Sequence, residues 1–157
     1  ACFISGNTFN HPSANVNKTA KRKELYLTHS AGFKHAVLPL SEQIFKELGE
    51  RTGAFEATVT QDCSVISKEG LKPFDAIVFY TTGELPISDE QKKAFIDFIK
   101  SGKGFVGIHS ATDTFYKWAE YGEMIGGWIK NGMAWVFTEN APRLAVAKKP
   151  TPTTIAA

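Results

Sequence analysis

The chain has 157 residues, of which 43% are hydrophobic and 22% are charged, and its formal net charge is +2. These values are typical of one globular domain and exclude a disordered chain, a collagen-like repeat or a disulfide-stapled miniprotein. The small charge argues against a nucleic-acid partner, and no apolar run reaches the roughly 18 residues that a membrane-spanning helix needs. Cys2 and Cys63 belong to no metal-binding spacing, and we expect two unpaired thiols.

The N-terminal half of the chain predicts a strand, a helix and a second strand. Residues 1–22 are polar without hydrophobic period, so we expect a flexible arm there. A short apolar run over 24–28 is typical of a strand buried on both faces. An amphipathic helix is predicted over 36–51, with Gly53 as its stop, from apolar residues at three- and four-residue steps: Val37, Leu40, Ile44 and Leu48. The period-two alternation of 55–60 predicts an edge strand.

The second half repeats the alternation of strand and helix. A continuous apolar run over 75–80 predicts the best-defined strand. Ser88, with Gln91 three residues later, forms a capping-box signature, and we expect a helix that buries Phe95, Phe98 and Ile99 and ends before Gly102. The segment 104–109 predicts a fourth strand, with glycine at two positions where a neighbour approaches closely.

Strands that alternate with helices favour a parallel sheet with right-handed crossovers. We therefore predict an α/β domain of the flavodoxin-like kind, a three-layer sandwich with a mainly parallel sheet in the strand order 2-1-3-4-5. In such folds ligands bind beyond the carboxyl ends of the strands. The loops 28–35, 81–84 and 109–113 follow the first, third and fourth strands, and they should share one crevice.

Three of the chain's four histidines fall in these loops, namely His29, His35 and His109. Imidazole titrates near neutral pH and serves as acid, base or metal ligand. Glu84 and Asp113 stand in the same loops, where a carboxylate orients a histidine or shares its proton chemistry. We predict His109 as the acid or base, His35 and Asp113 as assisting groups, and Glu84 as a group that polarises a hydroxyl. Surface roles for the histidines and Glu84, and helix capping by Asp113, remain the alternatives.

His109 occupies the strand-to-helix turn at which hydrolases place an exposed nucleophile between small residues. Because histidine stands there, an ordinary acyl-enzyme mechanism is disfavoured. An amidase-like hydrolase that uses the neighbouring Ser110 is a third hypothesis. A metal site built from the three histidines is conceivable, but no metal-binding spacing accompanies them, so we predict no metal and no cofactor.

Aromatic residues are dense after this turn, and flat rings stack on the apolar faces of pyranose rings. The ligand class that they favour is a small carbohydrate, although core packing explains most of them equally well. We predict contacts with such a ligand from six side chains: His29, Phe33, Thr82, Ser110, Trp118 and Tyr121.

Three segments resemble the signatures of the ThuA-like (trehalose utilisation) family: Thr28-His29-Ser30-Ala31-Gly32-Phe33-Lys34-His35, then Thr81-Thr82-Gly83-Glu84, then Gly104-Phe105-Val106-Gly107-Ile108-His109-Ser110-Ala111-Thr112-Asp113. The tract 118–127 resembles the family's next segment. The resemblance implies a class I glutamine-amidotransferase-like fold without the amidotransferase cysteine, and a role in the metabolism of trehalose or keto-disaccharides. It also favours a periplasmic or secreted location over a cytoplasmic one, and it leaves the oligomeric state open.

After residue 128 the sequence departs from the family pattern, so we expect a truncated or altered C-terminal part. The predicted layout is an arm over 1–22, an α/β domain over 23–147 and a disordered tail over 148–157. Segments 134–138 and 143–146 are compatible with further strands. Two functions remain open: a sugar-processing enzyme of hydrolase or isomerase type that uses histidine acid–base chemistry, and a non-catalytic carbohydrate-binding or interaction module of a larger secreted protein.

Overall fold

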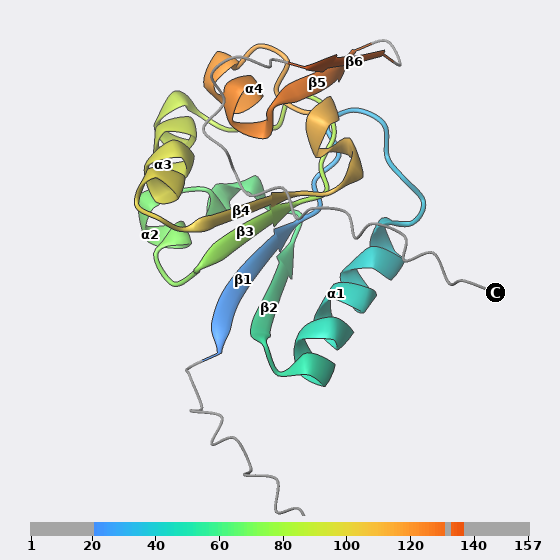
Figure 1. Ribbon diagram of the computed structural model, residues 1–157, viewed down its shortest axis with the longest axis vertical. Coiled ribbons are helices and arrows are strands. Elements are labelled where there is room, and N and C mark those ends of the chain that lie inside the picture. The colour runs from blue at the N-terminus through green and yellow to red at the C-terminus, as the bar shows by residue number, and fades with distance from the viewer. Residues whose placement is uncertain (1–20, 131–132, 137–157) are drawn as a thin grey trace, which may run out of the picture.

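The computed structural model describes residues 21–130 and 133–136, and the predicted tail, the strand over 143–146 and nearly all of the predicted arm lie outside these residues. A four-stranded parallel sheet forms the centre of the domain, in the order β2-β1-β3-β4 (Figure 1). Its strands are β1 (Arg22–Leu27), β2 (Phe55–Thr60), β3 (Ala76–Phe79) and β4 (Gly104–Gly107). All four predicted strands are confirmed, and so is the order of the first four positions.

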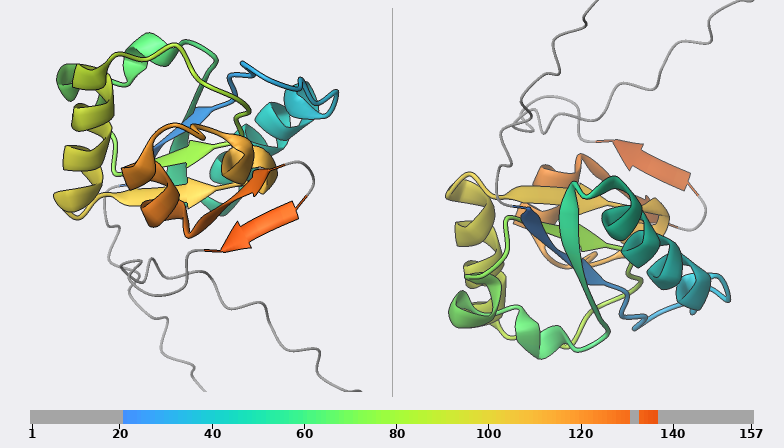
Figure 2. Two further views of the ribbon diagram at one scale, coloured as in Figure 1. Left: turned by 90° about the horizontal axis from the view of Figure 1, so that it is seen from above. Right: turned by 90° about the horizontal axis from the view of Figure 1, so that it is seen from below.

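Within residues 21–130, four helices and two short 3-10 turns connect the strands. The helices are α1 (Leu38–Thr52), α2 (Lys68–Leu71), α3 (Asp89–Lys100) and α4 (Ala119–Ile125), and the turns are η1 (Cys63–Val65) and η2 (His109–Asp113). Figure 2 shows α1 on one face of the sheet and α3 on the other. The fold is therefore an α/β sandwich of the flavodoxin-like kind, as predicted from the alternation of strands and helices.

The larger core lies between the sheet and the α2–α3 side. Leu25, Leu27, Ile77 and Phe79 point into it from β1 and β3, since alternate residues of a strand face the same side. The opposite residues, Tyr26 and Val78, belong to a smaller cluster under α1. Both faces of the two central strands are thus buried, which explains why they appear in the sequence as continuous apolar runs.

Helix α3 forms as its sequence predicts. The Ser88 hydroxyl accepts a hydrogen bond from the Gln91 backbone N–H (3.3 Å), and the Gln91 side chain accepts one from the Ser88 N–H (3.0 Å). This reciprocal pair satisfies two backbone donors at the start of the helix. Phe95 and Phe98 are buried on its inner side, and Ile99 is partly buried against the same core.

Helix α1 also forms, but a different side of it packs on the sheet than the sequence period indicates. Its apolar stripe of Val37, Leu40, Ile44 and Leu48 is 39–53% exposed. The buried side carries Leu38, Gly49 and the partly buried Phe45. The Phe45 ring lies between Tyr26 and Phe55, with ring centroids 4.6 and 5.0 Å away, and these two contacts fix the helix on β1 and β2. The helix therefore has two apolar sides, and the described residues cover one of them.

The last described strands leave the parallel sheet. Strand β5 (Gly127–Lys130) pairs antiparallel with β6 (Met133–Val136) in a separate two-stranded sheet. The predicted strand over 134–138 is confirmed in its described part, 134–136. No described strand occupies the predicted fifth position beside β4.

Candidate active site

The three predicted loops meet at the carboxyl rim of the sheet. The Thr82 carbonyl accepts hydrogen bonds from the backbone N–H groups of Ala31 (2.8 Å) and Gly32 (3.1 Å). One residue on, the Gly83 N–H donates to the Asp113 carbonyl (2.7 Å). The loop after β3 is thus hydrogen-bonded on one side to the loop after β1 and on the other to the segment after β4. The prediction that the three loops meet at one edge of the sheet is confirmed.

Two glycines make this junction possible. A Cβ atom on Gly83 would lie 2.6 Å from the backbone nitrogen of Gly32, and Gly83 has φ +73°. Both the close approach and the left-handed backbone favour glycine. Beside it, the Thr82 hydroxyl donates to the Phe33 carbonyl (2.9 Å) and accepts from the Gly32 N–H (3.3 Å). Thr82 is 1% exposed, so its side chain braces the loop, and its predicted contact with a ligand remains a prediction.

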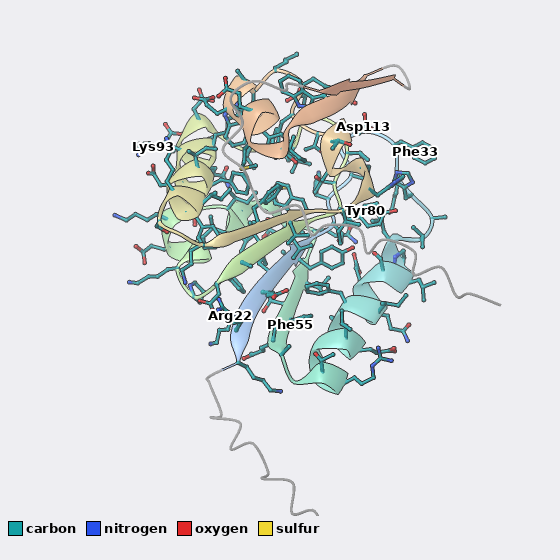
Figure 3. The ribbon with its side chains drawn as sticks, in the orientation of Figure 1. Arg22, Phe33, Phe55, Tyr80, Lys93 and Asp113 are labelled. Carbon is teal, nitrogen blue, oxygen red and sulfur yellow. The ribbon has the colours of Figure 1, made fainter. Side chains whose placement is uncertain are left out.

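Four rings gather on this rim. The centroids of His35 and His109 lie 4.8 Å apart, edge to face, and Tyr80 lies 5.6 and 5.7 Å from them. Phe33 packs edge-on against His35 at 5.0 Å while 69% of its own surface stays exposed. Figure 3 shows Phe33, Tyr80 and Asp113 at the same end of the sheet. We call the set Phe33, His35, Tyr80, His109 and Asp113 the rim cluster.

His109 holds an uncommon backbone conformation. Its φ is +48°, in the left-handed region that costs a residue with a Cβ atom about 1–2 kcal/mol. It stands two residues after β4, at the start of η2, and its side chain is exposed. Strain of this kind concentrates at functional sites, because surrounding structure must hold it in place. The strand-to-helix turn predicted at His109 is therefore present, and we call this turn the elbow.

The Asp113 carboxyl is the acidic member of the rim cluster. Partial burial raises its pKa, because a buried carboxylate loses hydration, while the nearby charges of His35 and His109 act in the opposite direction. Burial is the larger cause. Asp113 is the last residue of η2 rather than the first, so the alternative of helix capping does not describe it.

Ser110 is buried directly behind His109. It is 6% exposed, and its hydroxyl oxygen has no hydrogen-bond partner within the described part of the chain. Most buried hydroxyls are hydrogen-bonded, so this one is an exception with almost no accessible surface of its own. Its predicted role in ligand binding stays a prediction.

The remaining predicted residues have other surroundings. His29 places its Nδ1 atom 2.8 Å from the Gln61 carbonyl at the end of β2, and it makes no ring contact with the rim cluster. Glu84 is exposed, and its carboxylate accepts a hydrogen bond from the Lys117 N–H (3.2 Å). Neither residue belongs to the rim cluster, so their catalytic and binding roles stay predictions.

Trp118 and Tyr121 are core residues in the structure. They are 7% and 0% exposed, and the Tyr121 hydroxyl donates to the Ala111 carbonyl (2.8 Å). Both side chains therefore pack in the core, which was the alternative to a contact with a ligand. Tyr80 is the member of the rim cluster that no sequence signal singles out. It ends the apolar run over 75–80, and only its place at the carboxyl end of that strand points to the rim.

No three His, Cys, Asp or Glu side chains among residues 21–130 and 133–136 are arranged to hold a metal ion. Within the same residues, no helix has both the length and the apolar character needed to cross a bilayer.

The fold and the rim cluster define an α/β domain with a group of ionisable side chains at the carboxyl ends of parallel strands. The chain belongs to the ThuA (trehalose utilisation) family, whose model matches residues 23–155. It is similar to the crystal structure of a protein from Bacteroides uniformis named as ThuA-like, with 25% identity and a TM-score of 0.53. The likeness covers 69% of this chain and 45% of that one, so the chain spans less than half of that structure. No curated protein matches. Family membership associates the chain with carbohydrate metabolism.

Proposed function

We propose that the chain acts on a sugar in the rim cluster, with His35 and His109 as its acid–base pair. The observation that carries the proposal is the approach of the two imidazoles, whose centroids are 4.8 Å apart although 73 positions separate them in the sequence. Two neighbouring imidazoles can take a proton from one atom of a ligand and return one to another atom nearby.

The other members of the rim cluster suit a sugar. Phe33 presents an exposed ring that can lie under the apolar face of a pyranose. The Tyr80 ring contacts both histidines and holds their planes in place. The Asp113 carboxylate can accept hydrogen bonds from sugar hydroxyls, and it lies close enough to both imidazoles for their charges to lower its pKa.

This arrangement suits proton transfer next to a carbonyl group, as in a keto-disaccharide. One imidazole removes the proton from the hydroxyl-bearing carbon beside the carbonyl, and a second group protonates the carbonyl oxygen, so that a neutral enediol forms. The imidazole then returns its proton to the former carbonyl carbon, and the other hydroxyl gives its proton to the second group, which moves the carbonyl to the neighbouring carbon and restores both groups. A keto-disaccharide is therefore the substrate class that we propose.

The test is turnover of trehalose and of 3-keto-disaccharides by the protein and by two variants. His109→Ala should lower turnover by about 10²–10⁴-fold, the usual contribution of a general acid or base. Glu50→Gln is the control, because this exposed residue near the end of α1 belongs to neither predicted site, and it should keep its activity. Sugar binding without turnover would establish the binding module in place of the enzyme. If the protein neither binds nor converts these sugars, the proposal is refuted.

Asp113 makes the pH profile informative. Its pKa is raised from 3.8, so the carboxylate is lost at a higher pH than in an ordinary aspartate as the solution is acidified. Activity that needs the carboxylate should therefore fall on the acid side, starting above the usual aspartate range. Asp113→Asn should remove that limb of the profile, and an unchanged limb would show that Asp113 takes no part.

A further inference from the structure

A hollow at the carboxyl end of the sheet shares no residue with the rim cluster. It has a volume of about 560 Å³, and His29, Asp62, Ser64, Ser88 and Gln91 are among its lining residues. This volume is within the range of small-molecule sites. The lining comes from the ends of β1 and β2, from η1 and from the start of α3, and it includes neither lysine nor arginine.

The His29 ring has a fixed orientation in this hollow. Its Nδ1 atom lies 2.8 Å from the Gln61 carbonyl oxygen, which can only accept, so Nδ1 carries the hydrogen. In the neutral ring the other nitrogen, Nε2, is then the acceptor. A backbone carbonyl at the end of β2 thus holds a histidine of the first loop with one basic nitrogen left for a ligand.

Asp62 supplies the second acceptor. Its carboxylate accepts hydrogen bonds from the Ser64 N–H (2.8 Å) and the Ser64 hydroxyl (2.7 Å). These bonds stabilise the ionised form and lower its pKa, so the group is a carboxylate at neutral pH. Two oxygens with about four lone-pair positions retain capacity for a ligand after these two bonds.

Two acceptors without a neighbouring cation select a ligand that brings hydrogen-bond donors and no negative charge. We propose that the hollow binds a small uncharged polyol, of monosaccharide size, through hydroxyl groups that donate to Nε2 of His29 and to the Asp62 carboxylate. The proposal goes beyond the chemistry of the rim cluster and depends on none of its residues.

The experiment is an NMR titration of the histidine Cε1–H resonances of the full chain, assigned by single substitution. Glucose should shift the His29 resonance with saturation, and gluconate at equal concentration should shift it far less, because Asp62 repels its carboxylate. The His29 shift should persist in His109→Ala, so loss of the rim-cluster function leaves this result intact.

Asp62→Asn should weaken the glucose affinity about tenfold, the equivalent of about 1.4 kcal/mol for one charge-assisted hydrogen bond. Asp89→Asn is the matched control, since Asp89 begins α3 but does not line the hollow, and it should bind as the parent does. A His29 resonance that glucose leaves in place, an equal response to gluconate, or an Asp62→Asn variant with full affinity would each overturn the proposal.

Discussion

Replacing Gly83 with alanine should disrupt the junction of the loops more than it strains the backbone. Alanine at φ +73° costs about 1–2 kcal/mol wherever it occurs. At Gly83 the new Cβ atom would also lie 2.6 Å from the Gly32 nitrogen, and a backbone atom has little freedom to move away. Overpacking of this kind adds about 1–3 kcal/mol. We therefore expect Gly83→Ala to lower the free energy of unfolding by about 2–5 kcal/mol.

Gly53 provides a control with the same backbone and without the contact. Its φ is +65°, and a Cβ atom there would meet nothing within 4 Å. Gly53→Ala should therefore show the conformational cost alone, about 1–2 kcal/mol. Urea unfolding of both variants measures the difference, and sugar binding at the rim cluster should weaken only in Gly83→Ala. Equal losses of stability would refute the close approach of the two loops.

Two further predictions concern the core. Phe45→Ala should lower the free energy of unfolding by about 2–3 kcal/mol, because it removes two ring contacts. Ile44→Ala, at a position 53% exposed, should change the free energy of unfolding by less than about 1 kcal/mol. The urea midpoints of the two variants decide whether α1 is oriented as described. Burial, followed by the charge of Asp62, raises the pKa of the Cys63 thiol to about 11. The buried neutral thiol therefore contributes to stability, and this contribution is complete below pH 9.0 and is lost as the pH rises through about 11. Cys63 should accordingly resist alkylation at pH 8 until urea unfolds the chain, which peptide mass mapping measures. Fast labelling of the native protein would contradict this prediction.

The sequence predicts much of the fold because its local signals agree with one another. The capping box at Ser88 and Gln91 marks the start of α3 within one residue, and the alternating pattern of β2 gives its bounds as they are in the structure. The apolar period of α1 does not identify its buried side, because the period shows which residues are apolar and not which side chains of the sheet they pack against. Phe45 packs between two aromatic rings from different strands, and neither ring is adjacent to it in the sequence.

The candidate site follows the same division. Topology places the loops of His35 and His109 on one rim, so their meeting could be predicted. The separation of His29 depends on which way one side chain turns at the end of β1, and a hydrogen bond to a distant carbonyl decides that. Trp118 and Tyr121 could not be assigned to core or crevice, because an aromatic ring suits both environments.

The left-handed backbone at His109 lowers the stability of the folded protein, while the same residue supplies the imidazole that the proposed chemistry needs. Glycine adopts such a conformation without the steric cost that a Cβ atom brings. Selection for thermal stability alone would favour glycine there and would remove the imidazole. A histidine kept at this position across many generations would therefore be a sign that the elbow is maintained for its reactivity, at a standing cost to the folded state.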